Sequence, residues 1–196
     1  MIDAIVKELC ASSDVIEKCA AMSTQIEAAA KLTIAAFKQG GRLYLAGNGG
    51  SAALAQHLAA ELVGRYRMNR PALPAFCLTD NQAAVTAIAN DFGYDEVFRR
   101  QLAMASPGDV VWLFTTSGNS ANVLAALIDL RRRGVPVIAF TGAAGLHDYA
   151  ADVLMAVPSD VTSRVQDAHG VIGHVLCGLI ECGIFTGEEA LWLKYR

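Results

Sequence analysis

Two polar side chains interrupt an otherwise apolar stretch at residues 51–62 and can act together chemically. His57 and Glu61 lie four positions apart, so on a helix they share one face, about 40° apart around its axis. The rest of the stretch is mostly Ala and Leu, and such a segment seldom buries a carboxylate without a partner or a task. The spacing therefore predicts either a functional pair or a local His–Glu ion pair at the surface.

A second polar pair lies near the C-terminal end. Gln166 and His174 are eight positions apart, roughly 80° around a helix, so they can share one side. The sequence after His174 is nearly all apolar, where a histidine is either a satisfied core residue or a functional group. His169 lies off this line, and we expect a structural or subunit-interface role for it. Cys177 follows His174 by three residues, but no second Cys–His pair accompanies it to form a structural zinc site.

Two loops rich in Gly and Ser occupy equivalent positions. The loop 47–51 (GNGGS) follows the apolar run 43–46, and the loop 115–120 (TTSGNS) follows the run 110–114, each before an expected helix. Glycines let the backbone turn tightly and approach a ligand, and the free N–H groups at a helix start favour an anion. Hydroxyls that can donate to phosphate oxygens are those of Thr115, Thr116, Ser117 and Ser120.

Nucleotide-binding motifs fit these loops less well than phosphate binding does. Neither loop has the Gly-Lys-Ser/Thr ending of a Walker A sequence, and Gly47-Asn48-Gly49-Gly50-Ser51 does not fit the dinucleotide pattern G-x-G-x-x-G. Each loop alone could be a tight turn with a Ser or Asn helix cap. Two such loops together, one rich in hydroxyls, favour a phosphate monoester.

Short apolar runs alternate with helix-length segments along the rest of the chain. The runs, flanked by Gly, Pro or Asp, are typical of parallel strands buried on both faces; they are 43–46, 75–78, 110–114, 135–140 and 153–157. We expect helices at 51–64, 81–89 with 95–105, 119–133 and 163–183. The alternation predicts an α/β fold with a five-stranded parallel sheet of flavodoxin-like order flanked by helices. Ligands of such sheets bind beyond the carboxyl ends of the strands.

The first forty residues have helical spacing. Apolar residues return every three or four positions from Ile5 to Ile34, with a break near Ser12-Ser13, and Gly40-Gly41 would end the segment. The sequence contains no internal repeat or Pro/Ser-rich linker. We expect an N-terminal helical arm at 1–40 and a domain at 41–196, together one structural unit.

Composition limits the class of protein. The 196 residues are 54% hydrophobic and 18% charged, with a net charge of −3 and a pI near 5.8. These values exclude a disordered chain, give no positive field toward nucleic acid or anionic lipid, and suggest burial partly between subunits. The one basic cluster, Arg131–Arg133, is expected to end a helix, where cations suit the dipole.

Cysteine usage and the N-terminus predict a compartment. The five cysteines form no CxxC pair, so reduced thiols and a reducing environment are expected. Charged residues in the first ten positions favour an amphipathic helix over a signal peptide, and no uncharged apolar run approaches a membrane span. We expect a cytoplasmic protein with neither nucleic acid nor membrane as a partner.

Taken together, the loops and polar pairs resemble the sugar isomerase (SIS) superfamily and, over essentially the whole chain, its phosphoheptose (sedoheptulose-7-phosphate) isomerase family. The resemblance is carried by Gly47–Ser51, His57 with Glu61, Gly64–Tyr66, Asn90–Gly93, Thr116–Ser120, and Gln166 with His174. It implies a single SIS domain and an aldose–ketose isomerase that converts D-sedoheptulose 7-phosphate to D-glycero-D-manno-heptose 7-phosphate through an enediol. The product would serve heptose synthesis for lipopolysaccharide core or another bacterial surface glycan.

The resemblance also implies a site. One Zn²⁺ per subunit would be bound by His57, Glu61, Gln166 and His174; because an amide oxygen is an uncommon zinc ligand, partial occupancy is expected. The substrate would contact Asn48, Gly49, Gly50, Ser51, Glu61, Asn90, Asp91 and Gln166, with its phosphate on Thr115, Thr116, Ser117 and Ser120. The family assembles as a homotetramer with active sites at subunit interfaces.

The reaction assigns roles to two residues. A ketose becomes an aldose when one proton moves between C1 and C2 and another between O1 and O2, which needs an acid–base pair and stabilisation of the oxyanion. Glu61 and His174 are the candidates for this pair, and either can take the first proton. Burial would raise the pKa of Glu61, whereas a nearby zinc ion would lower it.

Some positions depart from the family pattern. Ser163 replaces a frequent acidic residue, Leu146 a glycine, and Thr115 a frequent serine. None of the three is a member of the proposed acid–base pair, so these departures bear on substrate detail.

Three different functions compete with the isomerase. A non-catalytic SIS protein that binds the replication initiator would lack the carboxylate and the terminal histidine present here. An SIS isomerase could instead act on arabinose 5-phosphate or an N-acetylated hexosamine 6-phosphate. A nucleotide-binding Rossmann enzyme would carry a different glycine fingerprint.

Overall fold

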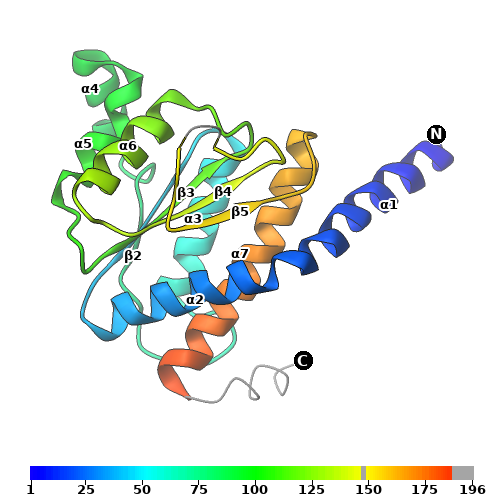
Figure 1. The fold of residues 1–196 in the computed structure, drawn as a ribbon, viewed down its shortest axis with the longest axis horizontal. Helices are drawn as coiled ribbons and strands as arrows, with labels where there is room; N and C mark the ends of the chain where they lie inside the picture. Colours follow the sequence, from blue (N-terminus) through cyan, green and yellow to red (C-terminus); the bar gives the residue numbers. More distant parts are fainter. Residues whose placement is uncertain (147–148, 187–196) are drawn as a thin grey trace.

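The protein folds around a parallel β-sheet. The computed structural model describes residues 1–146 and 149–186 (Figure 1), so the last residues of the predicted unit 41–196 lie outside the described part. Within that part the strands are β1 (Leu43–Gly47), β2 (Ala75–Cys77), β3 (Val110–Thr115), β4 (Val137–Thr141) and β5 (Val153–Ala156). Their order is β2-β1-β3-β4-β5 and every pairing is parallel. This is the predicted flavodoxin-like order.

The sheet register brings the two Gly/Ser loops together. Gly47 at the end of β1 pairs with Phe114 near the end of β3, and Thr115 pairs with Thr141 of β4. The next strand along the chain, β2, lies on one side of β1, and β3 lies on the other side of β1. The direction in which strands are added therefore reverses between β1 and β3. The loops 47–51 and 115–120 therefore lie at the switch point where ligands of such sheets bind.

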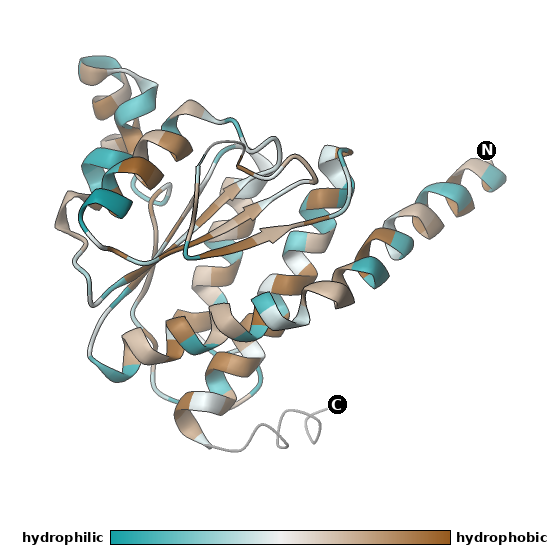
Figure 2. Ribbon diagram, in the orientation of Figure 1, coloured by the Kyte–Doolittle hydropathy of each residue, from teal (hydrophilic) through white to brown (hydrophobic). Residues whose placement is uncertain are grey.

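Helices cover both faces of the sheet. One face carries α2 (Ser23–Lys38), α3 (Gly50–Val63) and α7 (Thr162–Phe185); the other carries α4 (Gln82–Phe92), α5 (Val97–Gln101) and α6 (Ala121–Arg132). Short 3₁₀ turns are η1 (Cys19–Met22), η2 (Tyr94–Glu96) and η3 (Leu102–Met104). A hydrophobic core lies on each face: the first core under α2, α3 and α7, and the second core under α4, α5 and α6. Because successive strand residues point to opposite faces, Trp112 and Phe114 enter the first core, while Val111 and Leu113 enter the second core. Figure 2 shows the strands as the most continuously hydrophobic part of the ribbon.

The N-terminal helix α1 (Ile2–Lys18) projects from the body of the molecule (Figure 1). Residues 1–10 are exposed, and Glu8 accepts a 2.8 Å hydrogen bond from Arg164 of α7. The predicted break near Ser12-Ser13 was wrong, because α1 continues to Lys18 and the chain breaks at η1. Serine disfavours a helix interior only weakly, and the Lys18–Asp14 pair at 2.7 Å lies across the last turn of α1.

The last helix, α7, is a core element. By length and composition it could cross a membrane, but 56% of its apolar window is buried inside the fold, as in the core helix of a soluble protein. His169 on this helix is fully buried and its Nε2 lies 3.1 Å from the carbonyl oxygen of Thr141. Burial lowers the pKa of His169 to about 4. This histidine is therefore a structural residue inside the subunit.

Candidate active site

Two parallel helices position the candidate catalytic residues. A Cβ on Gly50 of α3 would meet the amide of Gln166 on α7 at 2.7–2.9 Å, and a Cβ on Gly173 would meet Leu58 at 2.5 Å. The two helices thus lie side by side from their N-terminal ends, and Gly50 and Gly173 allow their close approach. His57 and His174 come next along this contact.

The side chains of His57, Glu61 and His174 form one cluster. Their ligand atoms all lie within 4.8 Å of one another. The Nε2 atoms of the two histidines are 2.8 Å apart, and Nε2 of His57 is 3.7 Å from Oε1 of Glu61. The His–Glu pair predicted from the four-residue spacing exists, and the fold adds the distant His174 to it. A purely local surface pair is thereby excluded.

The surroundings of His174 tune its chemistry. Tyr66 stacks on the imidazole, with ring centroids 5.7 Å apart and an interplanar angle of 10°. Burial lowers the pKa of His174, the charge of His57 acts in the same direction, and Glu61 opposes both. His174 is therefore biased toward the neutral imidazole, which can accept a proton or bind a metal ion.

The two Gly/Ser loops line a hollow of about 270 Å³. Of the predicted substrate-binding residues, it is lined by Asn48, Gly49, Gly50, Ser51, Thr115, Thr116, Ser120 and Gln166. The hydroxyl oxygens of Thr115 and Ser120 lie 3.0 Å apart. The starts of α3 and α6 also lie at this hollow, and the positive end of each helix dipole favours an anion. Such a combination suits a phosphate group.

Tight backbone contacts fix the shape of the second loop. Gly118 has φ +68°, and a Cβ there would lie 1.7 Å from the carbonyl oxygen of Gly145. Gly142, just after β4, donates its N–H to the carbonyl oxygen of Thr116 at 3.0 Å. The loop therefore needs glycine at position 118 for both its conformation and its packing.

Asn48 is held by partners that the sequence did not indicate. Its side-chain amide exchanges two hydrogen bonds with that of Asn122, at 2.8 and 2.9 Å. The hydroxyl of Tyr94 donates to Oδ1 of Asn48 at 3.0 Å. Phe114 and Thr162 also line the hollow. The sequence signal for Asn122 was its place just after the second Gly/Ser loop, in the first turn of an expected helix.

Four predicted substrate contacts lie outside the hollow. Glu61 belongs to the cluster with His57 and His174, and the other three are Asn90, Asp91 and Ser117. Asn90 and Asp91 are exposed on α4 and bond to each other at 2.8 Å. Ser117 is exposed and its Oγ accepts the N–H of Asn119 at 3.2 Å. Their roles toward substrate stay predictions.

The donor set of the cluster fits a metal ion such as zinc. Two imidazoles and a carboxylate are the ligands of many catalytic zinc sites, which keep one position open. Gln166 reaches the hollow at Gly50, and its part in metal binding remains a prediction. Burial raises the pKa of Cys177 to about 12, and the carboxylates of Glu61 and Glu181 add to this shift. The thiol therefore stays protonated at neutral pH and is a poor ligand.

The departures from the family pattern leave the cluster unchanged. Leu146 is 2% exposed and packs in the second core, and Ser163 lies exposed in the first turn of α7. Thr115 takes part in the hollow through its hydroxyl.

The basic cluster, Arg131–Arg133, ends α6 as predicted: Arg131 pairs with Asp152 and Arg133 with Asp129.

Comparison with known proteins agrees with this architecture. A family model described as an SIS domain matches residues 10–142. The chain belongs to the SIS domain family.

Within that family, several relatives named phosphoheptose isomerase are similar to most of this chain. The phosphoheptose isomerase of Sulfurimonas denitrificans is 47% identical over 82% of this chain and 84% of its own. That of Akkermansia muciniphila is 44% identical over 89% and 94%. The structure of phosphoheptose isomerase from Neisseria gonorrhoeae superposes with a TM-score of 0.85 and 36% identity, covering 91% of this chain and 97% of that one. These similarities place the chain among the phosphoheptose isomerases.

Proposed function

We propose that the protein interconverts D-sedoheptulose 7-phosphate and D-glycero-D-manno-heptose 7-phosphate as an aldose–ketose isomerase. The observation that carries the proposal is the meeting of Glu61 and His174, from two helices, along the same helix pair that begins at the phosphate-type hollow. Membership of the phosphoheptose isomerases is consistent with it. The aldose–ketose reaction needs the acid–base pair that these two residues can supply.

The hollow orients the substrate. The phosphate would accept hydrogen bonds from the hydroxyls of Thr115, Thr116, Ser117 and Ser120 and from backbone N–H groups at the starts of α3 and α6. The cluster lies further along the same helix pair than the hollow does, so the opposite end of the sugar chain can reach the cluster. Asn48, Gly49, Gly50, Ser51 and Gln166, with Asn90 and Asp91, would contact the sugar between these ends.

Glu61 and His174 would transfer the protons. One of them removes the proton from C1 of the ketose, and the same proton or one from solvent is delivered to C2. The other group transfers the second proton between O1 and O2. His174 is available to accept a proton because its lowered pKa favours the neutral imidazole. Glu61 is held beside it with a side chain only 24% exposed.

We also propose that His57, Glu61, Gln166 and His174 bind one Zn²⁺ per subunit, with partial occupancy. When bound, the ion would polarise the substrate carbonyl and stabilise negative charge on its oxygen. The three clustered side chains support this assignment by their donor types and spacing.

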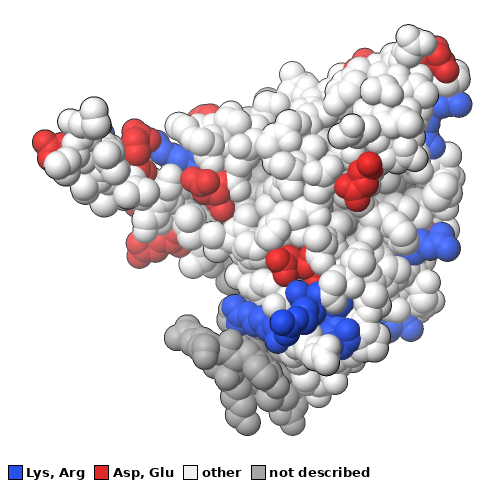
Figure 3. All heavy atoms as spheres, turned by 180° about the vertical axis from the view of Figure 1, so that it is seen from behind, with Lys and Arg blue, Asp and Glu red and all other residues white. Residues whose placement is uncertain are grey.

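A homotetramer with active sites at subunit interfaces is the proposed assembly. Apolar side chains of α1 support it: Ile2, Ile5, Val6 and Leu9 are 53–76% exposed. Much of the molecular face in Figure 3 is uncharged, with one group of Lys and Arg side chains near its lower edge and others along its right edge. The five cysteines are free thiols, which fits a cytoplasmic enzyme. Its product would feed heptose synthesis for lipopolysaccharide or another surface glycan.

A substrate panel tests the proposal. Purified protein is incubated with sedoheptulose 7-phosphate, arabinose 5-phosphate and N-acetylglucosamine 6-phosphate, each with and without a chelator. The proposal predicts an aldoheptose phosphate from the first compound, with slower formation after chelation. Turnover of either of the other two compounds alone would support a different SIS isomerase, and capture of an initiator protein without any turnover would support a binding protein.

A further inference from the structure

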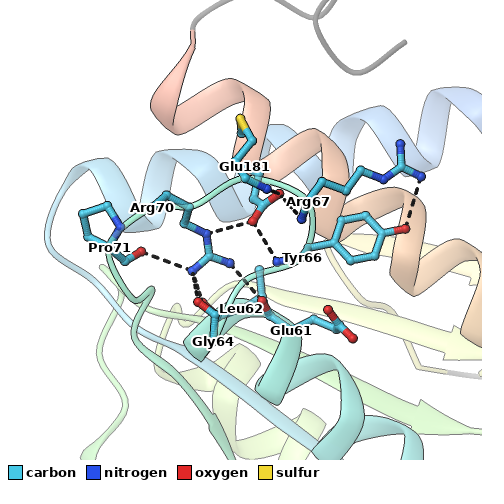
Figure 4. A network of polar contacts seen from close by, with 9 residues as sticks. Glu61, Leu62, Gly64, Tyr66, Arg67, Arg70, Pro71 and Glu181 are labelled. Carbon is cyan, nitrogen blue, oxygen red and sulfur yellow. Dashed lines mark hydrogen bonds and ion pairs between the residues drawn. The ribbon is translucent and has the colours of Figure 1, made fainter. Parts of the chain in front are cut away.

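A buried ion pair joins the loop after α3 to α7. Nε of Arg70 lies 2.9 Å from Oε1 of Glu181, and the two side chains are only 2% and 1% exposed. Figure 4 shows the pair at the centre of a polar network, with the loop that contains Tyr66 and Arg67 wrapped around the carboxylate. Charges buried to this degree need several hydrogen bonds to offset desolvation.

Glu181 organises the loop. Its carboxylate accepts the backbone N–H groups of Tyr66 and Arg67 at 2.9 Å and that of Met68 at 3.3 Å, besides the guanidinium of Arg70. The carboxylate thus fixes three successive backbone amides. It thereby sets the place of the Tyr66 ring, which stacks on His174.

Arg70 closes the C-terminal end of α3. Its Nη2 donates to the carbonyl oxygen of Glu61 at 2.9 Å, and its Nη1 donates to the carbonyl oxygens of Leu62 at 2.5 Å and Gly64 at 3.2 Å. The last carbonyls of a helix lack intrahelical partners, and a guanidinium satisfies them and suits the negative end of the dipole. The guanidinium therefore contacts the backbone of Glu61 itself.

These contacts connect each element that supplies a reacting group. One end of the pair contacts the backbone of Glu61, and the other belongs to the helix that carries His174 two turns earlier. Neither Arg70 nor Glu181 belongs to the cluster of His57, Glu61 and His174. Resting on the proposed function, we propose that Arg70 and Glu181 are positioning residues, which fix the distance between Glu61 and His174 for proton transfer.

A variant pair separates positioning from stability. Removing one partner of a buried pair destabilises strongly, whereas replacing both by apolar residues is often neutral. The double variant Arg70→Met/Glu181→Leu therefore leaves no unpaired buried charge, while it releases the loop and the end of α3. A misplacement of about 1 Å can lower turnover about 10²-fold.

A matched control exists on the other face of the sheet. Arg133 pairs with Asp129 at 3.0 Å and also donates to backbone carbonyls, including that of Leu102 at 2.9 Å. The double variant Arg133→Met/Asp129→Leu removes an Arg–carboxylate pair that also contacts backbone carbonyls but is more exposed, at 30% and 29%, far from the two catalytic helices. It should leave turnover unchanged.

Steady-state kinetics with sedoheptulose 7-phosphate and thermal unfolding are measured for the wild type and both double variants. We expect kcat to fall at least about tenfold in Arg70→Met/Glu181→Leu, with KM nearly unchanged because the phosphate loop is remote. A folded double variant with wild-type kcat would overturn the proposal. If it does not fold, Arg70→Lys decides: lysine keeps the charge but loses the planar fork that contacts Glu61 and Leu62, so an unchanged kcat in that variant would also overturn it.

Histidine ring-proton NMR provides a measurement independent of turnover. The signal of His174, assigned by its loss in His174→Gln, should shift in Arg70→Met/Glu181→Leu (or in Arg70→Lys if the double variant does not fold), because the stacked Tyr66 ring moves, and should stay in place in the control. An inactive wild type would refute the proposed function, while the NMR result would still decide the positioning role. An unshifted His174 signal would contradict that role.

Discussion

At the scale of residues, the candidate active site is built from side chains that come from distant parts of the sequence. His57 and His174 are 117 positions apart and their Nε2 atoms are 2.8 Å apart. Spacing within each helix predicted the pairs His57–Glu61 and Gln166–His174. Spacing could not predict Tyr66, Tyr94 or Asn122, because their contacts arise only from the tertiary fold.

Replacing either member of the acid–base pair should reduce turnover. Glu61→Gln and His174→Gln remove the proton-transfer group with little change in volume, and we expect kcat to fall about 10²-fold or more. Circular dichroism and thermal unfolding should remain close to wild type. Glu27→Gln, on an exposed Glu of α2 that pairs with Lys31, serves as the control. Near-normal turnover in both site variants would refute the proposed roles.

Removing one hydroxyl from the phosphate hollow should weaken substrate binding. Ser120→Ala deletes one donor to a charged group, a loss of about 1.5–3 kcal/mol, so kcat/KM should fall roughly 10- to 100-fold. The matched control is Ser106→Ala, at the opposite end of β3, whose hydroxyl bonds to Asp109 at 3.0 Å. Equal kinetics for the two variants would exclude Ser120 from phosphate binding.

At the scale of elements, burial on both faces of the sheet made the strands predictable. The six residues of β3 are all buried, so the apolar run was continuous and its type and place were predicted correctly. The break in the N-terminal segment was misplaced because Ser12 and Ser13 carry only a weak local signal. The side-by-side packing of α3 and α7 could not be predicted, because it depends on contacts such as that of Gly173 with Leu58.

The contact of α7 with the sheet should make stability depend on pH through His169. Its pKa is lowered from 6.5 to about 4 by burial, so the folded state binds fewer protons than the unfolded state between these values. Stability therefore falls as pH falls from 6.5 toward 4. Between pH 7 and pH 5 the wild type should lose about 2 kcal/mol more of unfolding free energy than His169→Gln.

Urea unfolding of both proteins at the two pH values measures this difference, and the other titrating groups cancel in the comparison. An equal pH dependence in the wild type and His169→Gln would show that His169 is not buried in the neutral form.

At the scale of the whole molecule, the projecting helix α1 is the feature least explained by a single subunit. Residues 1–10 are exposed, and an isolated helix of about that length has little stability of its own in water. Packing of its apolar side chains between subunits would stabilise it. The sequence anticipated burial between subunits through its high hydrophobic fraction of 54% and through the family resemblance.

Polar substitutions on α1 should therefore weaken the proposed tetramer. Ile5→Asp/Leu9→Asp places two charges among the exposed apolar residues of the helix, and light scattering after gel filtration should show a smaller particle than the wild type. Lys7→Asp, at an exposed polar position of the same helix, should leave the mass unchanged. A monomeric wild type would contradict the proposed assembly.

The central claim is that Glu61 and His174 move a proton between C1 and C2 of a heptulose phosphate. The most direct test is NMR of sedoheptulose 7-phosphate incubated with the wild-type protein in D₂O, beside Glu61→Gln. We predict signals of an aldoheptose phosphate, with deuterium at its C2 wherever the transferred proton exchanges with solvent, and both changes about 10²-fold slower or more with the variant. Unaltered ketose in the presence of folded, zinc-supplemented wild-type protein would refute this proton transfer.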